Sequence, residues 1–179
     1  MKKEIYLVLD NLRSKENVGS IFRTADAAGV KKIFLCGITP QPKNFQYRVL
    51  SSKYQGNEKD KIAKTALGAE KWVPWEYHSQ TWRCLEQLRD DGLSLIALEQ
   101  TKNSKNIFRN SQGLTSVELR LNLNQKIALV VGNEVRGLSP KILKYCDEVV
   151  HIPMYGRKES LNVSVAAGIA IYQILNSKS

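Results

Sequence analysis

Polar residues that could do chemistry are concentrated in three short blocks, residues 11–30, 128–139 and 151–174. The first block reads NLRSKENVGSIFRTADAAGV, with Asn17 where a helix is expected to begin and Arg23 on that helix. Arg23 falls away from the apolar face of the helix, so its guanidinium could grip a phosphate or a reacting group. Taken alone, however, the block fits better a plain helix that Asn17 caps and on which Arg23 is solvated.

The second block, ALVVGNEVRGLS, joins an apolar strand to a helix through a glycine-containing turn. Gly132, Asn133 and Glu134 follow the strand, and Gly137 precedes the helix. Glycine lets a ligand approach the backbone closely, so such a junction suits a nucleotide-like ligand. The block is neither the G-x-G-x-x-G of dinucleotide-binding folds nor a P-loop, which ends in Lys-Ser or Lys-Thr. An ordinary strand-to-helix connection with a surface glutamate explains it equally well.

The third block, HIPMYGRKESLNVSVAAGIAIYQI, runs from the end of a strand through a loop into a long apolar helix. Ser160 is well placed to act as a plain N-cap of that helix. Asn162 is harder to explain by local structure, because a polar amide in the first turn of a buried helix needs hydrogen-bond partners. The backbone or a ligand could provide them.

Other common kinds of chemistry lack their signatures in this sequence. There is no G-x-S-x-G elbow of a hydrolase, and the two histidines, His78 and His151, have no evident nucleophile partner. Cys36, Cys84 and Cys146 are far apart and show no zinc-binding spacing, so we expect no metal site. Such thiols are typically reduced in a cytoplasmic protein. No stretch approaches the length of a membrane span, and the first apolar run is too short for a signal peptide.

The three blocks must be positioned by strands and helices that alternate along the chain. This alternation predicts an α/β domain with a mostly parallel sheet and helices on both faces. In such sheets, ligands bind at the carboxyl ends of the strands. We expect strands at 5–9, 33–36, 72–77, 93–98, 127–131 and 149–152, with another possible in 117–123. We expect helices at 17–28, 60–69, 79–91, 138–146 and 160–177.

The chain is strongly basic, with 27 Lys and Arg against 17 Asp and Glu and a formal charge of +10. Such a surplus favours a polyanionic partner, RNA or DNA, although a solvated basic surface is nearly as good an interpretation. The basic residues are spread along the chain, which indicates a folded basic face rather than a disordered arm. Candidate RNA contacts in the loop regions 39–59 and 100–116 are Lys43, Arg48, Lys53, Lys102, Lys105 and Arg109.

Taken together, the three blocks resemble the SpoU/TrmH-type members of the SPOUT methyltransferase superfamily. The resemblance depends on N-x-G-x-x-x-R-x-A, then G-N-E-x-x-G-L-S after a strand, then I-P-M-x-G-x-x-x-S-L-N-V-S-V-A, in that order. The sequence contains all three, beginning at Asn17, Gly132 and Ile152. Similar residues between the blocks extend the resemblance over nearly the whole chain.

The resemblance implies properties that the periodicity does not. The fold would be an α/β fold with a C-terminal trefoil knot, which few proteins have. The chain would bind S-adenosylmethionine, act as a cytoplasmic homodimer and methylate a ribose 2′-hydroxyl of tRNA or rRNA. Residues 1–179 would form a single catalytic domain without an appended RNA-binding domain. The alternatives are a SPOUT enzyme that methylates a base and an RNA-binding protein that has lost its activity.

The same resemblance assigns roles to individual residues. Arg23 would be the principal catalytic residue, supported by Asn17, Glu134, Ser160 and Asn162. The cofactor would be bound largely by backbone groups around Leu98, Glu99, Gly132, Ile152, Met154 and Leu161.

Overall fold

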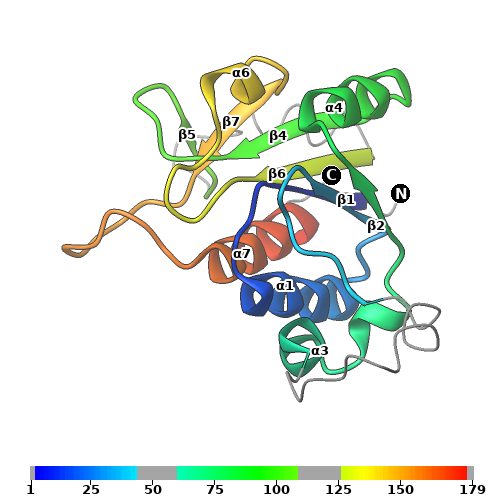
Figure 1. The fold of residues 1–179 in the computed structure, drawn as a ribbon. Helices are drawn as coiled ribbons and strands as arrows, with labels where there is room; N and C mark the ends of the chain where they lie inside the picture. The colour runs from blue at the N-terminus through cyan, green and yellow to red at the C-terminus, as the bar shows by residue number, and fades with distance from the viewer. Residues whose placement is uncertain (1–2, 44–59, 109–125, 177–179) are drawn as a thin grey trace.

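A computed structural model describes residues 3–43, 60–108 and 126–176 of the chain. In these ranges seven parallel strands form one sheet, in the order β3-β2-β1-β6-β4-β7-β5 (Figure 1). The strands are β1 (Glu4–Asp10), β2 (Lys32–Cys36), β3 (Trp75–His78), β4 (Ser94–Leu98), β5 (Lys105–Asn106), β6 (Lys126–Val131) and β7 (Glu148–His151). The helices are α1 (Lys15–Ala28), α3 (Lys61–Ala66), η1 (Ala69–Lys71, a 3₁₀ turn), α4 (Thr81–Asp90), α6 (Pro140–Leu143) and α7 (Val163–Asn176).

Helices cover both faces of the sheet. Helices α1, α3 and α7 pack on one face and α4 and α6 on the other (Figure 1). Successive residues of a strand point to opposite faces. In β1, Leu7 and Leu9 therefore join the core beneath α1 and α7, while Val8 joins the core beneath α4. Burial of both faces explains why these strands are continuous apolar runs, and it confirms the predicted parallel α/β architecture.

The strand order brings the three blocks to one edge of the sheet. Strand β6 lies between β1 and β4, and β4 lies between β6 and β7. All three pairings are parallel, so the carboxyl ends of β1, β4, β6 and β7 share an edge. The first block follows β1, the second follows β6, and the third begins at the end of β7. Side chains far apart in sequence therefore meet there.

The first and last helices are capped by residues other than those predicted. Helix α1 begins at Lys15 because Ser14 is its cap: the Ser14 Oγ accepts a hydrogen bond from the backbone N–H of Asn17 at 3.1 Å. Helix α7 begins at Val163, where the Oδ1 of Asn162 accepts from the backbone N–H of Ser164 at 2.9 Å. The expectations that Asn17 caps the first helix and that Ser160 caps the last are therefore wrong.

Smaller differences concern short elements. Strand β3 begins at Trp75 rather than residue 72, because η1 precedes it and the indole of Trp72 donates to Asp26 Oδ1 at 2.8 Å. The two-residue β5 was too short to predict. The possible strand in 117–123 and the candidate RNA contacts Arg48, Lys53 and Arg109 lie outside the described residues. The knot stays a prediction.

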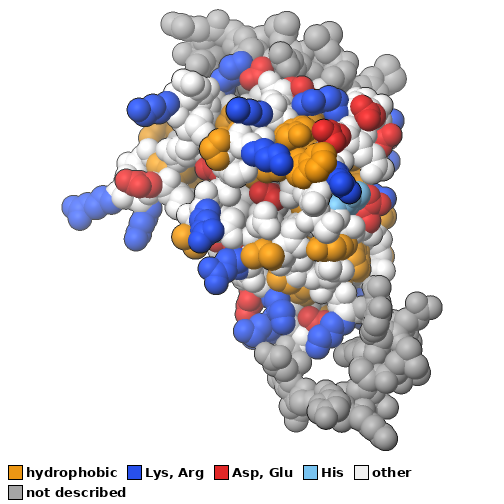
Figure 2. All heavy atoms as spheres, turned by 45° about the horizontal axis from the view of Figure 1, so that its top comes forward, with side chains coloured by type: hydrophobic (Ala, Val, Ile, Leu, Met, Phe, Trp, Pro, Cys, Tyr) orange, Lys and Arg blue, Asp and Glu red, His pale blue; other side chains and the backbone are white. Residues whose placement is uncertain are grey.

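The surface over α4 and α6 carries basic side chains without a single cluster. Figure 2 turns this side of the molecule toward the viewer, and its Lys and Arg side chains are spread across the face among acidic and apolar ones. In the described part of the chain, no helix is both long enough and apolar enough to cross a membrane.

Candidate functional site

A cavity of about 610 Å³ opens where β4, β6 and β7 end. Its walls come from the residues just after these strands and from the loop that leads into α7. This loop extends away from the body of the protein (Figure 1). All six residues expected to contact a cofactor line it: Leu98, Glu99, Gly132, Ile152, Met154 and Leu161. Glu134 and Ser160 line it as well.

The turn after β6 is held by Asn133, to which the sequence motifs assigned no role. Asn133 Oδ1 accepts hydrogen bonds from the backbone N–H groups of Val135 and Arg136, both at 3.0 Å. Its Nδ2 donates to the backbone carbonyl of Asn11 at 2.7 Å, which ties the second block to the first. An Asn that binds the backbone two residues ahead is a usual turn residue, and this signal could have identified it.

Gly132 in the second block is required by the packing of the protein's own backbone. A Cβ on Gly132 would lie 2.6 Å from both the carbonyl carbon of Gly137 and the backbone nitrogen of Leu138. Gly137 has a φ of +63°, the left-handed conformation in which the chain turns back over the strand end. The turn can therefore close over β6 only because residue 132 has no side chain.

Glu99 fixes the opposite wall of the cavity. Its Oε2 accepts from the backbone N–H of Leu138 at 2.7 Å, and its Oε1 accepts from the N–H of Gln100 at 3.0 Å. Both carboxylate oxygens thus have backbone partners. Glu99 holds the end of β4 against the segment that follows the second-block turn.

Glu134 reaches from the second block to the start of α1. Its Oε1 accepts from the backbone N–H of Ser14 at 3.0 Å and from Asn17 Nδ2 at 3.1 Å, and its Oε2 accepts from the N–H of Arg13 at 3.0 Å. Partial burial alone would raise the pKa of Glu134, but these donors outweigh burial and leave the pKa below its usual value. The group is therefore a carboxylate at neutral pH.

A directional chain of side-chain hydrogen bonds links the three blocks. An ionised carboxylate only accepts, so Glu134 turns the Nδ2 of Asn17 toward itself. The Oδ1 of Asn17 then faces Asn162, whose Nδ2 donates to it at 3.0 Å. The Oδ1 of Asn162 in turn accepts from the hydroxyl of Ser164 at 2.7 Å. Each amide is thereby fixed in one orientation.

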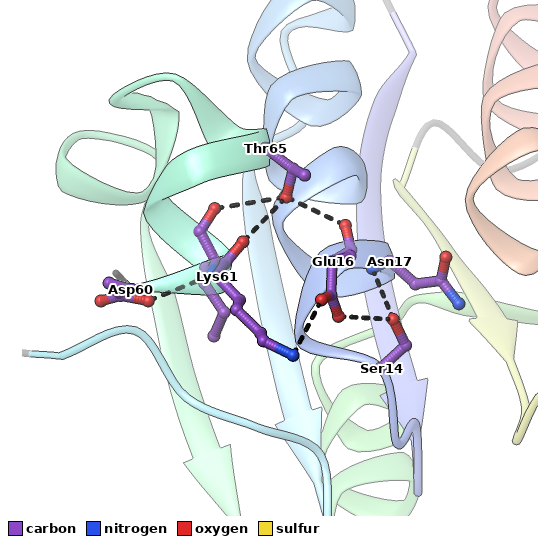
Figure 3. Close-up of polar contacts among 7 residues, drawn as sticks. Ser14, Glu16, Asn17, Asp60, Lys61 and Thr65 are labelled. Carbon is purple, nitrogen blue, oxygen red and sulfur yellow. Dashed lines mark hydrogen bonds and ion pairs between the residues drawn. The ribbon is translucent and has the colours of Figure 1, made fainter. Parts of the chain in front are cut away.

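The first turn of α1, which carries Asn17, is fixed against α3 (Figure 3). The Thr65 hydroxyl donates to the backbone carbonyl of Glu16 at 3.0 Å, and Lys61 forms an ion pair with the Glu16 carboxylate at 3.3 Å. A Cβ on Gly19 would lie 2.1 Å from the Thr65 hydroxyl oxygen, so glycine allows this close packing. The Asn17 side chain points away from α3 in Figure 3, toward the second and third blocks.

The structure separates the predicted catalytic residues into two groups. Asn17, Glu134 and Asn162 are joined by hydrogen bonds, and Ser160 lies at the cavity wall. Arg23 is exposed on α1 and does not line the cavity. No hydrogen bond or ion pair joins its side chain to another residue in the described ranges. The geometry of one chain therefore leaves Arg23 outside the cluster that surrounds the cavity.

The charge of the cavity is opposite to that of the chain. Glu99, Glu134 and Glu159 line it, and no Lys or Arg stands among the described residues of its wall. The chain as a whole has a formal charge of +10. The cavity therefore favours a cationic ligand over one that carries phosphates.

Potential metal ligands do not cluster in the described residues, and two of the three thiols have raised pKa values. No three His, Cys, Asp or Glu residues come together there in a way that could hold a metal ion. Interaction with Cys84 and burial raise the pKa of Cys36, and burial raises the pKa of Cys146 to about 12. Thiols with raised pKa values are poor nucleophiles at neutral pH.

Comparison with known proteins identifies the family of the chain. The model of the SpoU rRNA Methylase family matches residues 4–172. YacO of Bacillus subtilis, named for the TrmH family of tRNA/rRNA methyltransferases, is 29% identical over 99% of this chain and 61% of its own length. The tRNA (guanosine(18)-2′-O)-methyltransferase of Aquifex aeolicus is 31% identical over 96% of this chain and 69% of its own length.

Among solved structures, the AdoMet-bound rRNA methyltransferase from Sinorhizobium meliloti has a TM-score of 0.75 to this structure at 25% identity. The similarity covers 97% of this chain and 56% of that protein. This chain thus spans about 60% of the length of several relatives that it matches. The match over residues 4–172 places it within one family, and the chain belongs to the SpoU rRNA methylase family.

Proposed function

We propose that this chain is an S-adenosylmethionine-dependent methyltransferase that methylates a ribose 2′-hydroxyl of tRNA or rRNA. The observation that carries the proposal is the cavity where β4, β6 and β7 end, lined by glutamates in a strongly basic chain. Family membership supports the reaction class. The Aquifex aeolicus relative is named for 2′-O methylation of tRNA, which supports the ribose as the acceptor.

The residues of the cavity fit S-adenosylmethionine. A volume of about 610 Å³ is within the range of small-molecule sites. Leu98, Ile152, Met154 and Leu161 offer apolar walls to a nucleoside, and the glutamates suit a sulfonium. Two unit charges ~4 Å apart interact by ~4 kcal/mol at an effective dielectric constant of ~20. Between a glutamate and a phosphate this interaction is repulsive, so the site disfavours nucleotides that carry phosphates. When bound, the cofactor supplies an electrophilic methyl group on a positively charged sulfur.

The hydrogen-bonded chain from Glu134 to Asn162 would keep the acceptor side of the site in one geometry. Its partners are backbone groups and amides with fixed orientation, so little reorganisation is needed when substrate binds. Ser160 has an exposed hydroxyl at the cavity wall, where it can hydrogen-bond substrate or cofactor. Asn17, Glu134 and Asn162 are positioning groups in this proposal.

Arg23 would bind a phosphate of the RNA and orient the 2′-hydroxyl toward the methyl group. Its exposed guanidinium, without a partner in the described part of the chain, is available for that contact. Guanidinium groups stay protonated in proteins, so Arg23 acts through binding and orientation. The proton of the hydroxyl then passes to solvent or to a neighbouring group.

A second copy of the chain would complete the assembly. Helix α7 exposes Val165 and Tyr172, and the loop before it exposes Leu161, with 49%, 45% and 40% of their surfaces accessible. Exposed apolar side chains of this kind would suit an interface. Arg23 does not line the cavity of its own chain. In a homodimer, Arg23 of one copy could lie near the cavity of the other.

The proposal is tested with Arg23→Ala. We expect this variant to bind S-adenosylhomocysteine as the wild type does, measured by calorimetry, and to lose methyl transfer to RNA, measured with tritiated S-adenosylmethionine. Arg83→Ala on α4 is the matched control, since it removes an exposed arginine that does not line the cavity. Full activity of Arg23→Ala would refute its role.

The same assay separates the alternatives. A base-methylating enzyme would place the label on a base, which mass spectrometry of nuclease digests distinguishes from a methylated ribose. An inactive RNA-binding protein would transfer no label.

A further inference from the structure

One histidine lies in the wall of the cavity without a part in the network described above. His151 is the last residue of β7, and β7 is held in the sheet on both sides by β4 and β5. The backbone carbonyl of His151 accepts from the N–H of Ile107 at 2.9 Å. His151 is half-buried and is among the residues that line the cavity. The sequence indicates no role for it, because neither histidine has an evident nucleophile partner.

Several other polar side chains of the cavity wall already have protein partners. Both oxygens of Glu99 accept from backbone N–H groups. Both oxygens of Glu134 do the same, and one of them also binds Asn17. The amide of Asn133 is used at both ends. These groups shape the cavity and have few hydrogen-bonding positions left for a ligand.

The contacts of Ser104 decide which nitrogen of His151 carries the hydrogen. Ser104 Oγ lies 2.7 Å from the backbone carbonyl of Thr101 and 3.0 Å from His151 Nδ1, and it accepts from the N–H of Thr101 at 3.0 Å. A hydroxyl has one hydrogen to donate, and a carbonyl can only accept. Ser104 therefore donates to Thr101, and His151 Nδ1 must donate to Ser104.

This tautomer leaves Nε2 of His151 as a hydrogen-bond acceptor. No hydrogen bond joins Nε2 to another residue within the described ranges. The ring is thus fixed at Nδ1 by Ser104, and the described residues provide no donor for Nε2. Its neighbours at the strand ends are the apolar Leu98 and Ile152, which favour a flat nucleoside ring over a charged tail.

We propose that Nε2 of His151 accepts a hydrogen bond from the adenosine part of the cofactor and thereby contributes to recognition of the nucleoside. This inference rests on the proposed function. The donor is an N–H or O–H group, either the 6-amino group of adenine or a ribose hydroxyl. His151 is then a binding residue in addition to those that the sequence motifs indicate.

The tautomer can be observed directly, because the chain contains only two histidines, His78 and His151. We would record long-range ¹H–¹⁵N spectra of the imidazoles at mildly alkaline pH, with His78→Gln to assign the signals. We expect His151 to carry its hydrogen on Nδ1 in the free protein. Saturation with S-adenosylhomocysteine should move its Nε2 resonance in the direction of a hydrogen-bonded acceptor. An Nε2–H tautomer, or an Nε2 resonance that does not move, would overturn the inference.

Calorimetry tests the same contact through affinity. His151→Phe should lower the affinity for S-adenosylhomocysteine about tenfold, which corresponds to a loss of about 1.4 kcal/mol in binding free energy. His151→Gln, whose Oε1 can still accept, should recover part of that loss. S-inosylhomocysteine replaces the 6-amino donor with a carbonyl. If the amino group is the donor, the wild type binds the inosyl compound more weakly than S-adenosylhomocysteine, and His151→Phe binds the two equally. If a ribose hydroxyl is the donor, the wild type instead binds the 2′-deoxy or 3′-deoxy analogue more weakly, and His151→Phe again shows no difference.

The failure of this inference can be told apart from the failure of the proposed function. Normal binding of S-adenosylhomocysteine by His151→Phe, with an unmoved Nε2 resonance in the wild type, overturns the inference alone. A wild-type protein that binds no S-adenosylhomocysteine overturns both.

Discussion

Replacing Glu134 with Gln should destabilise the fold in a way that depends on pH. The carboxylate accepts three N–H hydrogen bonds, from Arg13, Ser14 and Asn17. Gln has a single acceptor oxygen. If that oxygen keeps the contacts to Ser14 and Asn17, its NH₂ group is directed at the backbone N–H of Arg13. Two donors then face one another where a charge-assisted hydrogen bond stood.

The magnitude follows from this change. A hydrogen bond to a charged group contributes ~1.5–3 kcal/mol when buried. Glu134 is only partly buried, so water compensates for part of the loss, and we expect about 1.5 kcal/mol. For a chain of this size, that corresponds to a fall of ~3–6 °C in melting temperature.

The pH dependence gives the prediction its sign. The folded-state pKa of Glu134 lies below the usual 4.5, so its stabilisation is fully present above that value and is lost as the pH falls through the folded pKa. The free energy of unfolding, measured with urea, should differ between wild type and Glu134→Gln at neutral pH. The difference should shrink in acid, where the wild-type carboxyl is protonated.

Glu159→Gln provides a matched control, because Glu159 lines the same cavity but is exposed and has no hydrogen bond within the described ranges. Its stability should equal that of the wild type. Wild-type stability of Glu134→Gln at neutral pH, or a deficit that persists unchanged in acid, would refute the reasoning.

Three further substitutions, with Gly156→Ala as a control, test other parts of the structure. Gly19→Ala should cost ~1–3 kcal/mol in urea unfolding, because its Cβ would lie 2.3 Å from the backbone carbonyl of Ile62. Gly156→Ala, which meets open space, should leave stability unchanged. Gly132→Ala should lower the affinity for S-adenosylhomocysteine about tenfold or more, measured by calorimetry, because its Cβ would displace the turn at Gly137. Wild-type affinity of this variant would contradict the expectation. Asn162→Asp should lower the rate of methyl transfer by about tenfold or more, since an acceptor oxygen would then face Asn17 Oδ1; an unchanged initial rate would exclude that role.

Much of the fold could be predicted from the sequence because both faces of the sheet are buried. Runs such as residues 5–9 and 127–131 are apolar throughout, and the structure places them side by side as β1 and β6. The resemblance added the order of the blocks and the family, which the comparisons confirm. The knot and the single-domain organisation stay predictions.

The contacts within the site could not be predicted, because they join residues distant in sequence. Ser14 and Asn17 are both good caps, and the structure shows that Ser14 takes this role and leaves the Asn17 amide free for Glu134. His151 has its partner 47 residues away, at Ser104, so no local pattern could reveal it. The position of Arg23 outside the cavity wall is likewise a tertiary fact.

The central claim is most directly tested by methyl transfer from tritiated S-adenosylmethionine to total tRNA and rRNA taken from cells that lack this protein. Ribose 2′-O-methylation protects the adjacent phosphodiester bond from alkali, so the position of the label can be determined by alkaline hydrolysis followed by mass spectrometry. The proposal predicts label in alkali-resistant dinucleotides with the wild type and none with Arg23→Ala. Label on a base would contradict the ribose assignment, and the absence of label from both RNA fractions would contradict the proposed activity.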